Sequence, residues 1–117
     1  MVILYLTCAD TKEADKIGQE LLNKKLVVCV RQINVRSSYW WEDKISNDDE
    51  VLLMMESGEE LFEKINKVVA KLHSYEQYVL TMTKVDKTTR GVEEWLDKYL
   101  GSRPVGWAET SYSIKWG

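Results

Sequence analysis

Hydrophobic and polar residues follow two different periods along the chain, and each change of period marks a new element. Residues 2–8 (VILYLTC) form an apolar run of strand length, which predicts a buried strand. Apolar residues then recur at helical spacing at Ala14, Ile17 and Leu21. This spacing predicts an amphipathic helix that begins at Thr11.

A hairpin is predicted after this helix. Residues 26–35 return to β-branched residues, and the chain stays extended through residues 37–44. The Asn-Asp-Asp sequence at 47–49 predicts the turn. The apolar run at 51–55 predicts the returning strand.

Two capping signals precede helices. Asp10 with Glu13, and Ser57 with Glu60, have the spacing of a capping box, in which a short polar side chain and a glutamate three positions later satisfy free backbone N–H groups. Apolar residues at helical spacing follow the second signal at positions 61, 65, 68, 69 and 72. Residues 78–85 then predict a fourth strand, and residues 92–100 a third helix that ends at Gly101.

The predicted order is β-α-β-β-α-β-α, with residues 2–35 and 51–86 repeating one strand-helix-strand pattern. Two such units joined by a hairpin predict the α+β class and a ferredoxin-like βαββαβ sandwich, with an antiparallel four-stranded sheet and both helices on one face. We expect one domain over residues 1–100. Residues 101–117 form a tail, for which two alternatives stay open: an extra short strand at 111–116, or a linker that includes residues added by cloning.

Composition excludes several classes of protein. The 117 residues carry a net charge of −3 and no run of Lys and Arg, so binding of nucleic acid is not expected. The N-terminal apolar run lacks a basic segment and is too short for a signal peptide or a membrane span. We therefore expect a cytoplasmic protein without direct membrane insertion, with both of its cysteines reduced.

No catalytic motif is present. The chain lacks a P-loop, the G-x-S-x-G and H-E-x-x-H motifs and paired C-x-x-C motifs, and His73 is its one histidine. No Ser or Cys lies in a context that would make a triad with it. We expect a protein that is not an enzyme.

Three consecutive aromatic residues indicate self-association. Tyr39, Trp40 and Trp41 lie in the predicted hairpin, and adjacent strand residues point to opposite faces. Trp40 and Trp41 therefore cannot both enter the core of one subunit, and each is too large and apolar to leave in water on both sides. We expect these three residues at a subunit interface.

Five segments resemble the divalent-cation-tolerance (CutA) family, in order and with spacing intact over residues 1–100. Residues 7–10 (TCAD) are similar to its T-x-P-D segment, 26–30 (LVVCV) to L-x-A-C-A, 38–45 (SYWWEDKI) to Y-x-W-x-G-K, 72–75 (LHSY) to H-P-Y and 95–96 (WL) to W-L. The chain departs from the family pattern at four positions, namely Ala9, Asp43, Ser74 and Val79.

The resemblance implies a non-catalytic homotrimer that responds to metal ions. It implies Cys8 and His73 as ligands for a weakly bound divalent cation, copper above others, which suits a thiolate and an imidazole. The remaining ligands would come from Asp10, Glu76, water or a neighbouring subunit. The alternatives are that Cys8 is a small buried hydrophobic residue, that His73 complements a helix dipole and that Asp10 caps a helix.

Two other functions stay open. One is a PII-like regulatory trimer that binds a small anion or a nucleotide between subunits, with candidate contacts at Arg31, Arg36, Lys44 and Arg90. The other is a structural scaffold that holds a membrane-protein partner.

Overall fold

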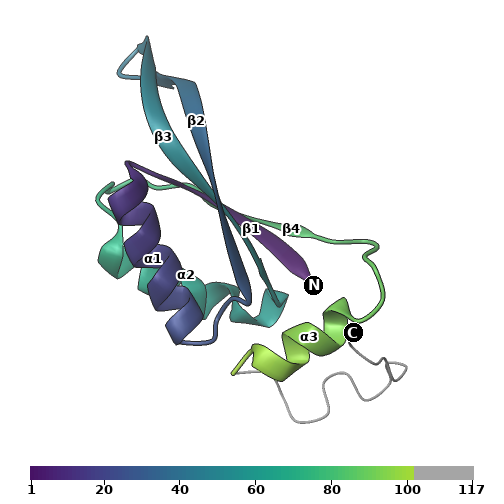
Figure 1. Ribbon diagram of the computed structural model, residues 1–117. Coiled ribbons are helices and arrows are strands. Elements are labelled where there is room, and N and C mark those ends of the chain that lie inside the picture. Colours follow the sequence, from purple (N-terminus) through teal and green to yellow (C-terminus); the bar gives the residue numbers. More distant parts are fainter. Residues whose placement is uncertain (102–117) are drawn as a thin grey trace.

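A four-stranded antiparallel sheet with the order β2-β3-β1-β4 forms the frame of the molecule (Figure 1). The computed structural model describes residues 1–101. The strands are β1 (Val2–Cys8), β2 (Cys29–Trp41), β3 (Lys44–Ser57) and β4 (Leu80–Lys84), and the helices are α1 (Thr11–Asn23), α2 (Phe62–Leu72) and α3 (Val92–Tyr99), with a 3₁₀ turn η1 (Glu59–Leu61) before α2. The predicted α+β ferredoxin-like fold is confirmed.

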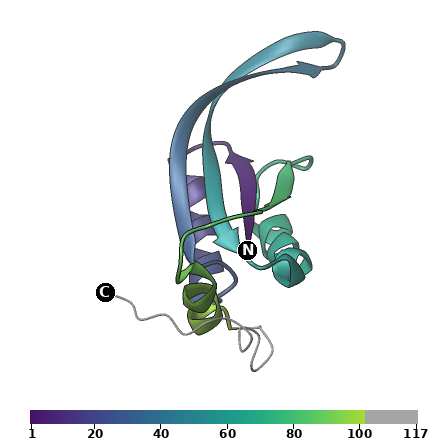
Figure 2. The same cartoon turned by 90° about the vertical axis from the view of Figure 1, so that its right-hand side faces the viewer.

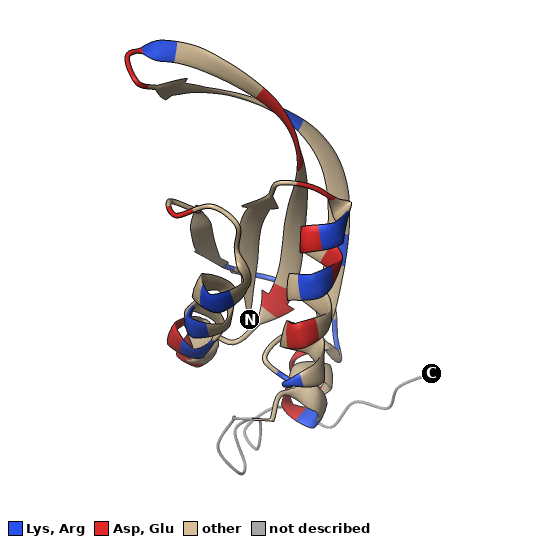
Figure 3. Cartoon of the chain, turned by 90° about the vertical axis from the view of Figure 1, so that its left-hand side faces the viewer, with Lys and Arg blue, Asp and Glu red and all other residues tan. Residues whose placement is uncertain are grey.

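The core lies between the sheet and helices α1 and α2, which lie side by side against one face (Figures 1 and 3). Every second residue of β1 is buried, because alternate strand residues point to the same face. The buried apolar residues include Leu4, Leu6, Ile17, Leu21, Leu53, Met55, Leu61, Ile65, Val69 and Leu96. Basic and acidic residues are interspersed along α1 and α2 (Figure 3).

Strands β2 and β3 extend far beyond the rest of the sheet (Figures 1 and 2). Pairing of β3 with β1 ends at Val51, opposite Cys8. Pairing of β2 with β3 continues out to Trp41 and Lys44. Residues 35–50 therefore form a two-stranded arm, as we call it below, that projects from the sheet.

The turn of the arm differs from the sequence-based prediction. It consists of Glu42 and Asp43, both with left-handed backbone (φ 48° and 62°), as in two-residue turns whose twist matches that of the strands. The predicted turn at 47–49 is wrong, because these residues pair with 36–38 inside the ladder. They look like a turn in the sequence because the arm is exposed, and its strands carry polar residues for that reason.

Of the two predicted capping signals, only the one before α1 provides an N-cap. Asp10 caps α1, since its Oδ1 accepts a hydrogen bond of 2.8 Å from the Glu13 N–H. Ser57 does not cap α2. It is the fully buried last residue of β3, and its hydroxyl donates to the Leu26 carbonyl at 2.6 Å, while Gly58 precedes η1.

Helix α1 ends in a Schellman motif without glycine. The Lys25 N–H donates to the Leu22 carbonyl and the Leu26 N–H to the Leu21 carbonyl, both at 3.0 Å. Lys25 has left-handed backbone (φ 57°).

Other boundaries shift slightly from the sequence-based prediction, because β4 spans five residues and α3 ends at Tyr99. Apart from Gly101, the predicted tail lies outside the described residues. Among residues 1–101, no helix is long and apolar enough to cross a membrane.

Candidate metal centre

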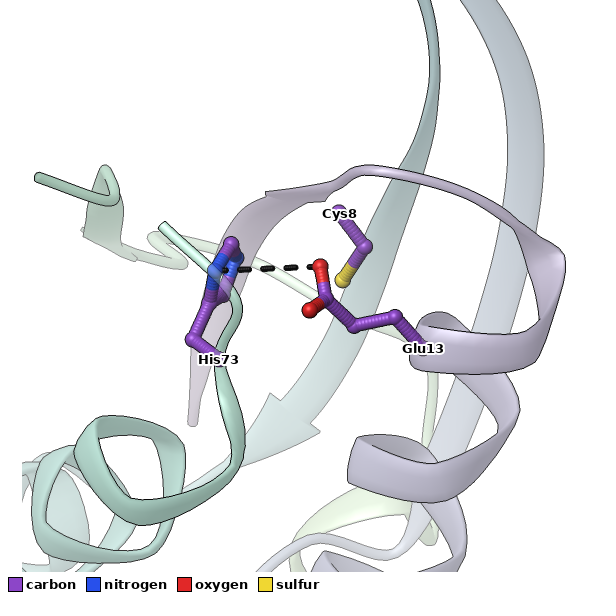
Figure 4. A group of neighbouring side chains, drawn as sticks. All are labelled: Cys8, Glu13 and His73. Atoms are coloured by element: carbon purple, nitrogen blue, oxygen red, sulfur yellow. Dashed lines mark ion pairs between the residues drawn. The ribbon is translucent and has the colours of Figure 1, made fainter. Parts of the chain in front are cut away.

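Three side chains from separate segments meet where β1 ends (Figure 4). Cys8 is the last residue of β1, Glu13 lies in the first turn of α1, and His73 follows α2 directly. The Cys8 sulfur, a Glu13 carboxylate oxygen and a His73 ring nitrogen all lie within 4.8 Å of one another. These three residues form the candidate metal centre.

The Glu13 carboxylate is held by two backbone groups. Oε1 accepts a hydrogen bond of 2.9 Å from the Ala9 N–H, and Oε2 accepts one of 2.6 Å from the Ser74 N–H. Burial raises the pKa of Glu13, but the hydrogen bonds from Ser74 and Ala9 and the nearby His73 more than offset this effect, so its pKa is lowered. Glu13 is therefore a carboxylate at neutral pH.

The imidazole of His73 is fully buried, and hydrogen bonds fix its tautomer. Nε2 lies 2.8 Å from the Thr7 carbonyl, while Nδ1 lies 3.0 Å from the Tyr75 N–H. Since a carbonyl only accepts and an N–H only donates, Nε2 carries the proton and Nδ1 carries the lone pair. Nδ1 is also the nitrogen that faces Glu13, with 3.7 Å to Oε1.

Two tyrosines enclose this ring. The Tyr78 ring stacks on it with centroids 5.2 Å apart, and the Tyr75 ring lies at 4.9 Å. Tyr78 donates from its hydroxyl to Asn66 of α2 at 2.5 Å, and Tyr75 donates to Oε2 of Glu50 in the arm at 2.8 Å. The pKa of Tyr75 is raised by burial and by this bond.

The Cys8 thiol is buried and protonated at neutral pH. Burial, followed by the negative charges of Glu13, Asp10 and Glu50, raises its pKa to about 12. A metal ion binds the thiolate. Coordination at Cys8 therefore releases one proton.

The donor set fits a divalent cation of intermediate softness. One sulfur, one imidazole nitrogen and one carboxylate oxygen are ligands that copper and zinc accept. The Thr7 carbonyl accepts from the Nε2 proton and so holds the ring in place, which leaves the lone pair on Nδ1, 3.7 Å from Oε1 of Glu13.

An acidic cleft of about 480 Å³ lies beside the start of α1, at the root of the arm. Three of its lining residues are Asp10, Asp49 and Glu50, and the others are Ala9, Thr11, Asn34, Val35 and Val51. Carboxylates favour cations over anions at this surface. Of the candidate anion contacts, Arg31 pairs with Glu56 and Arg36 lies 3.5 Å from Asp49.

The family resemblance implies two members of the centre, Cys8 and His73, but not the third, Glu13. The structure brings Cys8 and His73 together, while the side chain of Asp10 caps α1 and Glu76 does not belong to the centre. Glu13 was interpreted as part of a capping box. Its carboxylate instead accepts hydrogen bonds from the Ala9 N–H and from the N–H of Ser74, which lies 61 positions further along the chain.

The three residues predicted at an interface lie near the end of the arm. Tyr39, Trp40 and Trp41 are 40%, 73% and 55% exposed, and Ile45, opposite Trp40, is also exposed. Their role at an interface stays a prediction.

Comparison with known proteins places the chain among metal-tolerance proteins. Residues 2–99 match the family model described as CutA1 divalent ion tolerance protein. The divalent-cation tolerance protein CutA of Pyrococcus horikoshii is 32% identical over 96 residues, which cover 82% of this chain and 94% of that protein. The corresponding protein of Thermotoga maritima is 31% identical over 96 residues, covering 82% and 95%.

Solved structures agree with the sequence comparisons. CutA1 from Pyrococcus horikoshii superposes with a TM-score of 0.83 at 29% identity, covering 87% of this chain and all of that one. A structure described as the periplasmic divalent cation tolerance protein CutA from Archaeoglobus fulgidus gives 0.83 at 28% identity, covering 86% and 99%. On this evidence the chain belongs to the CutA1 divalent ion tolerance family.

Proposed function

We propose that this protein is a non-catalytic, cytoplasmic homotrimer that binds a divalent cation at Cys8, Glu13 and His73 and acts in the response to metal ions. The observation that carries the proposal is the meeting of three different ligand atoms within 4.8 Å in a buried site. The carboxylate is already ionised, and the tautomer of His73 leaves a lone pair on Nδ1, the nitrogen that lies 3.7 Å from this carboxylate. Copper is expected to bind more tightly than zinc, as the divalent series predicts.

Binding at this centre is expected to be weak and dependent on pH. Cys8 loses a proton, and Nδ1 of His73 exchanges the Tyr75 N–H for the cation. Below a thiol pKa of about 12, the displacement of one proton raises the apparent affinity by about tenfold for each unit of pH. The wild-type protein should show this slope, and any residual binding in Cys8→Ala should lack it.

Calorimetric titration of the reduced protein tests the site. Zinc and cobalt are the first probes, because they do not oxidise thiols, and copper(II) follows without oxygen. Cobalt also reports a cysteine ligand through its thiolate charge-transfer absorption. Titration in buffers of different ionisation enthalpy counts the released protons, which should number about one for each cation.

Matched variants locate the ligands. Cys8→Ala and His73→Ala should each abolish most of the binding, and the double variant should add little, because ligands of one site act together. Cys29→Ala is the control, since Cys29 opens β2 and lies outside the candidate metal centre. Unchanged affinity in both single variants would place the cation elsewhere.

The PII-like alternative receives less support from the cleft. A phosphate-bearing ligand would meet Asp10, Asp49 and Glu50 there, and like charges repel. A nucleotide titration run beside the cation titrations separates the two. No heat in either would favour the third alternative, a scaffold for a membrane-protein partner.

A further inference from the structure

Tyr75 contacts the candidate metal centre and the arm at the same time. Its backbone N–H donates to Nδ1 of His73 at 3.0 Å. Its hydroxyl donates to Oε2 of Glu50 at 2.8 Å. One residue thus joins the centre to strand β3.

Glu50 lies where the arm leaves the sheet. Pairing of β3 with β1 begins at the next residue, Val51. Glu50 itself pairs with Val35 of β2 and with no residue of β1. From Glu50 outward the arm is a two-stranded ribbon (Figure 2). The Tyr75–Glu50 hydrogen bond therefore fixes the root of the arm to the connection that follows α2.

The bond between Tyr75 and His73 cannot coexist with coordination. Neutral imidazole has one lone pair, and the Nε2 proton is directed to the Thr7 carbonyl, so the lone pair is on Nδ1. A cation bound to Nδ1 takes the lone pair that the Tyr75 N–H now uses. The backbone at Tyr75 must then move away from the ring, and the hydroxyl end of the same residue is bound to the arm.

We propose that cation binding at Cys8, Glu13 and His73 is linked to the position of the arm through Tyr75 and Glu50. This inference rests on the function proposed above and names how that site is regulated. The cation displaces the Tyr75 N–H, weakens the Tyr75–Glu50 bond and releases the root of the arm. Linkage is reciprocal, so a change that frees the arm also tightens cation binding.

The test compares Tyr75→Phe with Tyr78→Phe. Both changes remove one hydroxyl beside the ring of His73 and keep the backbone N–H groups. The Tyr75 hydroxyl binds the arm, whereas the Tyr78 hydroxyl binds Asn66. Tyr78→Phe is therefore a matched control for packing around the imidazole.

Zinc affinity is the first measurement, made by calorimetry on the full chain. Tyr75→Phe should bind zinc about tenfold more tightly than the wild type, because a hydrogen bond to a carboxylate no longer has to be broken. Tyr78→Phe should bind zinc as the wild type does.

Hydrogen–deuterium exchange is the second measurement. Zinc should accelerate exchange in peptides within residues 35–50 of the wild type. In Tyr75→Phe these peptides should exchange fast even without zinc, and added zinc should change their exchange rates little.

The outcomes separate the two proposals. Zinc binding with equal affinity in the wild type and Tyr75→Phe, and with unchanged exchange in the arm, would overturn the linkage and leave the metal site intact. Absence of zinc binding in the wild type would overturn the metal site, and the linkage with it.

Discussion

Oε2 of Glu13 accepts a hydrogen bond of 2.6 Å from the backbone N–H of Ser74, 61 positions further along the chain. The bond joins the first turn of α1 to the connection after α2, and Oε1 of the same carboxylate accepts from the Ala9 N–H. Glu13 thus holds both chain segments that carry the other two members of the centre.

Glu13→Gln should destabilise the protein by about 1–3 kcal/mol, because an amide can accept at one end only and presents an N–H to the other donor. The folded-state pKa of Glu13 is lowered from 4.5. The stability it contributes is therefore fully present above pH 4.5 and is lost as the pH falls through the folded-state pKa. Urea unfolding at pH 7 and at stepwise lower pH measures both effects.

Glu63→Gln is the control for this prediction, since Glu63 is an exposed glutamate in the first turn of α2. Its stability curve should follow that of the wild type within about 0.5 kcal/mol. Equal stability of Glu13→Gln and the wild type at pH 7 would show that the two backbone hydrogen bonds contribute little.

The sequence predicts those features of the fold that depend only on residues close together within one strand or helix. The strand at residues 2–8, the helical spacing of Ile65 and Val69 and the cap at Asp10 depend on neighbours along the chain, and these predictions are confirmed. The arm was predicted poorly. Its two strands are exposed over most of their length, so burial imposes no alternation of polar and apolar residues on them.

The candidate centre was predictable only in part, for a different physical reason. Resemblance to family motifs selected Cys8 and His73, which the fold brings together. Glu13 has the spacing of a capping box with Asp10, so the sequence predicts a role for it at the start of a helix and none at the centre. The Ser74 bond and the approach of Nδ1 depend on how α1 and the loop after α2 pack together, which no local pattern records.

Lys25→Gly should stabilise the protein by about 1 kcal/mol. Lys25 has left-handed backbone at the end of α1, a conformation that is unfavourable for a residue with a Cβ atom and natural for glycine. Lys24→Gly is the control, because Lys24 has φ −83°, and this change should be neutral or destabilising. Thermal and urea unfolding of the three proteins measure the difference, and a loss of stability in Lys25→Gly would contradict the argument.

The proposed trimer should be measurable by sedimentation equilibrium at micromolar concentration. Trp40→Ala and Trp41→Ala should each weaken association by about 2 kcal/mol or more, because large aromatic residues dominate interfaces. Stability of both variants should depend on protein concentration. Lys67→Ala, an exposed change on α2, should associate as the wild type does, and a 13.7 kDa species in the wild type would refute the assembly.

The two cysteines should differ in reactivity toward N-ethylmaleimide at pH 7.5. Cys8 is fully buried with a pKa raised to about 12, whereas Cys29 is partly exposed. Since the thiolate is the reactive form, Cys29 should be labelled first in the folded protein, and both should react once urea unfolds it. Mass spectrometry of the wild type, Cys8→Ala and Cys29→Ala identifies the modified residue. Faster labelling of Cys8 would mean that its site opens to solvent.

The strand pairing that leads to the two-residue turn at Glu42 and Asp43 limits how the arm can change its length in evolution or by design. Side chains alternate between faces at every residue, so inserting one residue into each strand between the root and the tryptophans would exchange the faces of Trp40 and Trp41. Inserting two residues into each strand would keep both faces. The arm can therefore grow or shrink in steps of about 7 Å while Trp40 and Trp41 keep their faces.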